Sequence, residues 1–215
     1  VDGRIKDTFI KYSTAQKTKA YDMYTRFYRW AMDRVDRDGM IAFITNRSFI
    51  DSRTMDGFRK CVQDEFAYAY IIDTHSDVRA NPKIAGTTHN VFGIQTGVAV
   101  MFLVRKEEKS GPCQIFYTEL DDEWRKEEKW EWFRTQEDFA RLPFRQISPN
   151  KQNSWIGFAD SDFDTLLPSI SKEVKGGRGQ EALFRSFALG VVTARDEWVY
   201  GADETTVKTR VKHLI

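Results

Sequence analysis

The stretch HNVFGIQTGVAVMFLVRK, residues 89–106, decides how the rest of this sequence is read. Its second half, Val98–Val104, is apolar at every position, which is typical of a strand buried on both faces. Its first half is a polar loop in which Phe92 stands beside Gly93. Phe92 is either a core side chain under a glycine turn or an aromatic platform for a planar ligand such as a base. The local sequence alone favours the core interpretation.

Upstream of this stretch, helical and strand patterns alternate. Apolar residues recur every three or four positions over 19–36, which predicts an amphipathic helix ended by Gly39. The apolar run 40–45 predicts a buried strand, residues 52–66 a second helix, and 67–74 another strand. This order indicates an α/β fold with a parallel sheet. On the first helix the expected apolar face is Ala20, Tyr24, Phe27, Tyr28, Ala31 and Val35, with Arg26, Arg29, Asp33 and Arg34 off that face.

Composition bounds the class of protein. The chain has 215 residues, 41% hydrophobic and 30% charged, which is enough for a real core in one large domain or a core plus a smaller domain. A net charge of +1 argues against a basic tail but leaves room for a local DNA-binding cleft. The 2 cysteines lack CxxC spacing and the 3 histidines lack metal-ligand spacing, so we expect no metal site and a reducing, cytoplasmic setting. No apolar run is long enough for a bilayer, so no membrane partner is expected.

The amino-acid composition of the sequence changes after Lys109. One more strand is expected in 113–120, followed by a charged, Trp-rich segment and a loop-like region over 134–150. A last helix is expected near 203–215. We place a domain boundary at about 110 to 120. The chain also begins without a start residue, in what reads as the middle of a loop, so we expect it to be a fragment of a longer polypeptide.

Several polar and aromatic residues have both a structural and a functional interpretation. Asp22 suits a helix N-terminus and Tyr24 an amphipathic core position, but the pair could also flank a ligand. Asn46 follows the strand 40–45 and either forms a turn or faces a ligand at the strand's carboxyl end. Arg195 and Trp198 read as a surface charge beside an anchoring ring, or as DNA contacts. The residues alone leave these alternatives open.

Four segments, taken in order, resemble a known family. They are 19–50, 67–77, 90–106 and 182–200, and they cover most of the chain. Together they resemble the carboxyl-terminal half of a gamma-class DNA adenine-N6 methyltransferase, and more narrowly the methyltransferase and target-recognition region of the Type ISP restriction–modification enzymes.

The resemblance implies half of a Rossmann-like sheet that binds S-adenosylmethionine. Segments 40–45, 67–73 and 98–104 would be its fifth, sixth and seventh strands, the last one antiparallel. Residues 1–110 would then be the end of the methyltransferase core, and 111–215 the start of an α+β target-recognition domain. Half a sheet exposes an edge, so we expect strand 40–45 to be uncovered on one side or covered by a partner.

The resemblance also implies roles for individual residues. Phe92 matches the aromatic wall against a flipped adenine, whose N6 attacks the cofactor's methyl group without a metal. Asp22 and Tyr24 match the motif flanking the cofactor and base pocket, with Asn46 at its edge. Arg195 and Trp198 become DNA-recognition candidates. The implied partner is double-stranded DNA, and nuclease and helicase domains would lie upstream in the same polypeptide.

The sequence departs from the family at two motifs. The glycine-rich cofactor motif and the Asn-Pro-Pro-Tyr catalytic loop are absent, and Asn81-Pro82 continues with Lys83-Ile84. We therefore assign no catalytic residue here and expect the chain alone to be inactive. Two alternatives stay open, a DNA-binding specificity module without catalysis and an unrelated α/β domain. A strand 98–104 parallel to its neighbours would exclude the methyltransferase interpretation.

Overall fold

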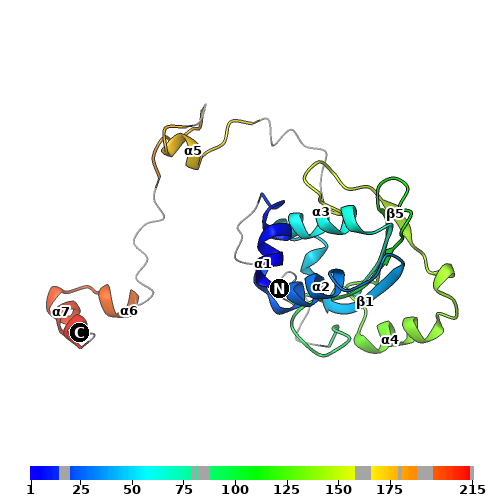
Figure 1. Ribbon diagram of the computed structural model, residues 1–215. Coiled ribbons are helices and arrows are strands. Elements are labelled where there is room, and N and C mark those ends of the chain that lie inside the picture. The colour runs from blue at the N-terminus through cyan, green and yellow to red at the C-terminus, as the bar shows by residue number, and fades with distance from the viewer. Residues whose placement is uncertain are drawn as a thin grey trace. The chain divides into compact units, whose positions relative to one another are not determined.

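The computed structural model divides the chain into two compact units, residues 1–159 and 160–215 (Figure 1). Among the residues that the structure describes, the first unit carries the sheet and most of the helices, and the second carries three short helices. The structure describes residues 1–14, 20–78, 81, 88–157, 166–178, 181–187 and 196–213.

A mixed five-stranded sheet forms the centre of the first unit, in the spatial order β1-β3-β2-β4-β5. β3 lies between β1 and β2 and is antiparallel to both, which confirms the expected antiparallel strand. β2 and β4 are parallel, whereas β5 is antiparallel to β4. The sheet is therefore mixed rather than parallel. The strands are β1 (Gly39–Asn46), β2 (Tyr68–Asp73), β3 (Val98–Arg105), β4 (Gln114–Glu119) and β5 (Arg145–Ile147).

β3 is apolar from Val98 to Val104 because it has neighbours on both edges and is at least partly covered on both faces. Ala99, Met101 and Leu103 point to one face and are fully buried. Val100 and Phe102 point to the other face and are half-buried. The period-2 alternation thus separates a closed face from a partly open one.

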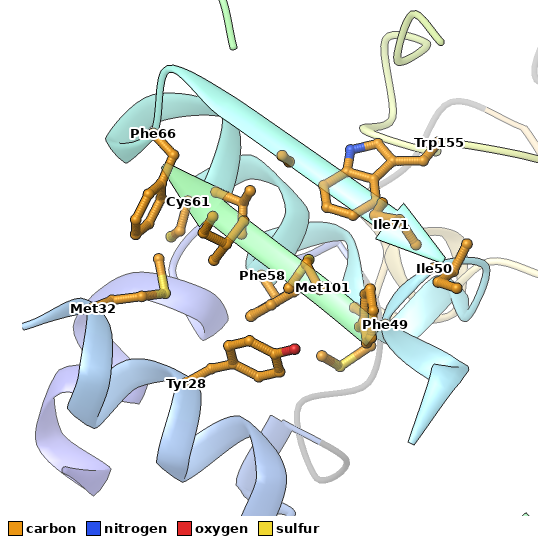
Figure 2. Close-up of a cluster of buried hydrophobic side chains, with 14 of the residues drawn as sticks. Tyr28, Met32, Phe49, Ile50, Phe58, Cys61, Phe66, Ile71, Met101 and Trp155 are labelled. Atoms are coloured by element: carbon orange, nitrogen blue, oxygen red, sulfur yellow. The ribbon is translucent and has the colours of Figure 1, made fainter. Parts of the chain in front are cut away.

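Helices from the first third of the chain cover the closed face (Figure 1). Tyr28 of α2 and Phe58 of α3 meet edge to face with ring centroids 5.1 Å apart, and they pack towards Met101 of β3 (Figure 2). Trp155, which follows β5 in the chain, is also buried there, and its ring centroid lies 6.4 Å from that of Phe49. The helical elements on this face are α1 (Asp2–Ile5), the π-helical segment Lys6–Ile10, α2 (Met23–Met32) and α3 (Asp56–Glu65).

The predicted apolar face of the first helix is confirmed at Ala20, Tyr24, Tyr28, Ala31 and Val35, which lie in or against the core, and it is wrong at two positions. Phe27, expected in the core, is 56% exposed, whereas Arg29, expected outside, is 1% exposed. The Arg29 guanidinium is buried because it bonds Glu65 at 2.7 Å and Asp33 at 2.7 Å. Hydrophobic periodicity cannot detect such a residue, because its partner Glu65 lies on another helix. In the second predicted helix, Met55, Phe58, Val62 and Phe66 recur at helical spacing and are all buried.

β1 forms the edge of the sheet, as expected for strand 40–45, and no other described strand pairs with its outer side. Met40 and Ile44 on its open face are 62% and 58% exposed. The prediction that this strand is buried on both faces is therefore wrong, while the prediction that it is uncovered on one side is confirmed.

The sheet continues past residue 110, because β4 pairs with β2 along its whole length. The compact units divide at residue 159 rather than at 110. The boundary between a methyltransferase core and a target-recognition domain at about 110 stays a prediction. The loop-like region 134–150 contains a short 3-10 turn, Phe139–Arg141, as well as β5, and the charged segment before it forms α4 (Lys126–Thr135).

The described residues of the second unit include short helices. They are α5 (Lys172–Lys175), α6 (Asp196–Val199) and α7 (Glu204–Lys212), and α7 confirms the helix expected near the carboxyl end. None of the helices in the described part of the chain has the length and hydropathy needed to cross a bilayer.

The contact between α3 and the N-terminal segment requires a glycine at position 57. A Cβ there would lie 1.9 Å from the Phe9 carbonyl oxygen, a backbone atom that cannot rotate away. We predict that Gly57→Ala lowers the unfolding free energy by roughly 2 kcal/mol or more, as overpacking does. Gly3→Ala is the matched control, because nothing lies within 4 Å of its Cβ. Equal urea midpoints for the two variants would contradict this packing.

The two buried thiols give the stability a pH dependence. Burial raises the pKa of Cys61 to about 12 and that of Cys113 to about 11. An unfolded thiol ionises near pH 8.5, so above about pH 9 the native state binds more protons than the unfolded state and the unfolding free energy falls. We expect a loss of up to about 1.4 kcal/mol per pH unit for each thiol. Urea unfolding at several pH values should show a shallower slope for Cys61→Ala than for the parent chain.

Candidate functional site

Three connections meet at one edge of the sheet. Because β3 is antiparallel to β1 and β2, the ends of those two strands lie beside its beginning. Asn46 pairs with Val98 and Asp73 pairs with Ala99. The segments after β1, after β2 and before β3 are therefore neighbours. Two of the residues singled out in the sequence lie here, Asn46 at the end of β1 and Phe92 in the loop before β3.

A buried ion pair joins the first two segments. Asp73 is fully buried and accepts hydrogen bonds from Arg47 Nε at 2.9 Å and Nη2 at 2.8 Å. Arg47 Nη1 also reaches Asp51 at 2.9 Å. Burial alone would lower the pKa of Arg47, but the hydrogen bonds and charges of Asp73 and Asp51 raise it above its ordinary value. Arg47 is therefore a fixed cation that holds the ends of β1 and β2 together.

Gly97 allows the segment before β3 to approach this pair. The Arg47 backbone N–H donates to the Gly97 carbonyl at 3.0 Å. A Cβ at position 97 would lie 2.4 Å from Arg47 Cδ and 3.0 Å from Asp77 Cβ. Gly93 has a different reason to be glycine, since its φ of +67° lies in the left-handed region and its surroundings are open.

The residues directly after β2 are strained and hydrogen-bonded. His75 and Ser76 have φ values of +53° and +59°, which are rare for non-glycine residues. The His75 N–H donates to Asp73 Oδ1 at 2.9 Å, and the Ser76 N–H donates to Asp122 Oδ1 at 2.9 Å. Tertiary contacts therefore impose this conformation.

α4 anchors the same segment through a buried lysine. The Lys129 side chain is fully buried, and its Nζ donates to the Thr74 carbonyl at 2.8 Å and to Ser76 Oγ. Burial lowers the pKa of Lys129, and the nearby charge of Asp122 opposes that shift. The Lys126 N–H also donates to the Thr88 carbonyl at 3.0 Å. These bonds fix α4 against the connection between β2 and β3.

Phe92 is presented outward by a closed loop. Asn90 is 1% exposed, its Oδ1 accepts from the Phe92 N–H at 2.9 Å, and its Nδ2 donates to the Thr96 carbonyl at 2.7 Å. Phe92 itself is 51% exposed. The core interpretation, which the local sequence favours, is therefore wrong.

Phe92 lines an apolar cavity of about 120 Å³. Trp130 of α4 lines it as well, and the adjoining surface comes from the open face of β1 and β3. This cavity can receive a flat apolar group, but its walls offer no hydrogen bond to a polar one. The lining residues are Ile44, Thr74, Val91, Phe92, Val98, Val100, Trp130 and Phe133.

Two further candidates from the sequence converge on Ser48. Tyr24 Oη lies 3.0 Å from Ser48 Oγ, and burial raises the pKa of Tyr24 to about 12. Asn46 Oδ1 accepts from the Ser48 N–H at 2.8 Å. Asp22 precedes α2, is exposed, and forms no side-chain cap bond within the described residues, so its role stays a prediction.

The remaining candidates belong to the second unit. Trp198 lies in α6 and is 37% exposed. Arg195 lies outside the described residues. Their proposed contacts with DNA stay predictions.

Sequence reasoning missed the residues that hold the site together. The sequence indicated no role for Asp73 or Lys129. Arg47 stood out only as part of the polar run 45–48 after strand 40–45, and Trp130 only as part of a charged, Trp-rich segment. The sequence does contain a signal for the pair Arg47–Asp73. Arg47 lies just after one expected apolar strand, and Asp73 lies at the end of another strand expected in the same sheet. No such signal marks Lys129, which is one charged residue among many in KEEKWEW.

Comparison with known proteins gives solved structures only. No protein-family model matches the sequence, and no curated protein does. The protein in the structure of the DrdV–DNA complex shares 44% sequence identity with this chain over 99% of its length, with a TM-score of 0.82. The ATP-dependent Type ISP restriction-modification enzyme LlaBIII bound to DNA is 30% identical over 98%, with a TM-score of 0.86.

A third similar structure is a nuclease-deletion mutant of the Type ISP enzyme LlaGI with a DNA substrate mimic. It is 27% identical over 98% of this chain, with a TM-score of 0.81. The chain spans only 21%, 14% and 20% of these three proteins, respectively. Its fold therefore recurs as a small part of larger proteins that were solved with DNA.

The buried ion pair predicts unequal effects of two similar substitutions. Asp73→Asn leaves the Arg47 charge buried without its main counter-ion, so we expect a loss of roughly 3–5 kcal/mol of unfolding free energy. Glu107→Gln removes the carboxylate from the exposed pair with Arg37, whose side chains are 53% and 78% exposed, and should cost less than about 1 kcal/mol. Urea unfolding of both variants measures the difference. Similar losses would show that Arg47 does not depend on Asp73.

Proposed function

We propose that this chain is part of a site-specific DNA adenine-N6 methyltransferase within a longer restriction–modification polypeptide. One observation carries the proposal. β3 is inserted antiparallel between β1 and β2, and the loop that leads into it presents a half-exposed Phe92 at the sheet edge. In the proposed assignment, β1, β2 and β3 are the fifth, sixth and seventh strands of a Rossmann-like sheet. The likeness to Type ISP enzymes solved with DNA supports the proposal.

Phe92 would stack on an adenine turned out of the DNA duplex. Extruding a base costs a few kcal/mol, and one aromatic stacking contact returns roughly 1–3 kcal/mol. Asn90 and Gly93 set the position of the ring before the base arrives, so little entropy is lost on binding. Asn46 and Tyr24 would flank the pocket. With a pKa of about 12, the Tyr24 hydroxyl stays protonated at neutral pH and keeps its bond to Ser48.

The aromatic cavity does not fit S-adenosylmethionine. Its walls are apolar and offer no partner for ribose hydroxyls or for the amino-acid end of that cofactor. Under the proposal, the cofactor and the reacting amino group are held by residues outside this chain. The residues of this chain bind and orient the base.

A DNA-binding specificity module without catalysis is the second candidate. The missing Asn-Pro-Pro-Tyr motif and the aromatic, arginine-containing second half of the chain favour it. Gel-shift titrations of this chain against cognate and random duplexes test it. Tight, sequence-selective binding that weakens as salt rises would support this candidate. Binding seen only with the longer polypeptide would favour the methyltransferase.

The base-stacking role of Phe92 is tested in the longer polypeptide. Its target adenine is located by sequencing methylated DNA and is replaced by 2-aminopurine in one duplex. We predict that Phe92→Ala slows methylation roughly 10-fold or more and changes the 2-aminopurine emission of the bound duplex. Ile94→Ala is the matched control, because Ile94 lies on the same loop, is 46% exposed and is not among the lining residues. Unchanged methylation and emission in Phe92→Ala would remove this residue from the role.

A further inference from the structure

We propose that Trp130 is a second stacking wall of the base pocket, facing an extrahelical purine from the α4 side. This inference rests on the proposed function and goes beyond it. Phe92 alone offers one ring on one loop, whereas the cavity also has Trp130 in its lining.

The cavity has the surface of a site for a planar ring system. Its volume is about 120 Å³, below the roughly 150 Å³ of an apolar cavity that takes up benzene, so it would cover part of a purine and leave the rest of the ring system outside. Phe92 and Trp130 are 51% and 49% exposed, so two large aromatic side chains share one solvent-facing apolar surface. Neighbouring exposed apolar side chains of this kind mark interaction sites. Phe133, one helical turn after Trp130, adds a third ring to the same lining.

α4, which carries Trp130, is anchored to the connection between β2 and β3. Its sequence neighbour Lys129 is fully buried and bonds the Thr74 carbonyl and Ser76 Oγ on the connection that carries Phe92. Lys126 adds the backbone bond to Thr88 on that same connection. The two aromatic walls therefore belong to one hydrogen-bonded frame, and a ligand between them pays little to order them.

A polar group is available on the same face of the sheet. Asn46 and Ile44 point to the same face of β1 by strand alternation, and Asn46 pairs with Val98, which lines the cavity. Asn46 Oδ1 is used by the Ser48 N–H, whereas its Nδ2 donates no hydrogen bond to any described residue. This amide can donate to a ring nitrogen of the purine, while the apolar walls cover the faces of the base.

The test separates stacking on a base from a general effect on DNA binding. The longer polypeptide binds two duplexes, one with the target purine and one with an abasic site at that position. We expect Trp130→Ala to weaken binding of the first duplex roughly 5- to 100-fold and to leave the abasic duplex unchanged. Trp130→Phe keeps a ring and should restore most of the difference. Trp30→Ala is the matched control, because Trp30 is 45% exposed on α2 and is not among the lining residues.

Each outcome decides between a ligand and a packing role. Equal weakening of both duplexes by Trp130→Ala would overturn the proposal, because it would show a structural role for the ring. Unchanged binding of both would overturn it as well, and a cavity filled by another protein segment would explain that result. If Phe92→Ala shows the base-dependent loss and Trp130→Ala does not, the proposed function survives and this inference fails. If neither variant does, the base pocket itself is rejected.

Discussion

The buried pair between Arg47 and Asp73 is the interaction on which the site depends. It ties the end of β1 to the end of β2 across the beginning of β3, with Gly97 packed directly against the arginine. Two buried charges are costly to desolvate, so the pair persists only because each partner satisfies the other. The chain carries this cost at the one edge of the sheet where three connections meet.

Two sets of bonds then position the connection between β2 and β3. On one side Asp73 binds Arg47, and its Oδ1 also accepts from the His75 N–H. On the other side Lys129 holds Thr74 and Ser76 to α4. Between them Asn90 closes the small loop that turns Phe92 outward. An exposed aromatic ring on a fixed loop is what a stacking site requires, because a mobile ring would lose part of its binding free energy to ordering.

Patterns of apolar residues predicted the framework well. The strands expected in 40–45, 67–74, 98–104 and 113–120 and the second helix agree with the structure, because a run such as Val98–Val104 is apolar only where both faces are covered at least in part. The apolar patterns indicated a parallel sheet, and only the family resemblance implied that β3 is antiparallel. Patterns failed at Phe27 and Arg29, where an ion pair with Glu65 overrides the expected burial. They also failed to reveal that Lys129 is buried, since its partners are a backbone carbonyl and a hydroxyl about 55 residues away. The family resemblance, rather than any local signal, directed attention to Phe92.

The sequence by itself determined β1 to β4, α2, α3 and α7 and their order, together with the candidates Asp22, Tyr24 and Asn46 near the ends of such elements. Phe92 was added by the family resemblance. Local propensity and periodicity are properties of neighbouring residues, so they can be read from the sequence. Only the tertiary structure decided which side chains share one pocket. Phe92 and Trp130 come together because Lys129 bonds a distant carbonyl, and Arg47 meets Asp73 because β3 lies between their strands. Such long-range pairings depend on the closure of the whole sheet, and no short segment of the chain encodes them.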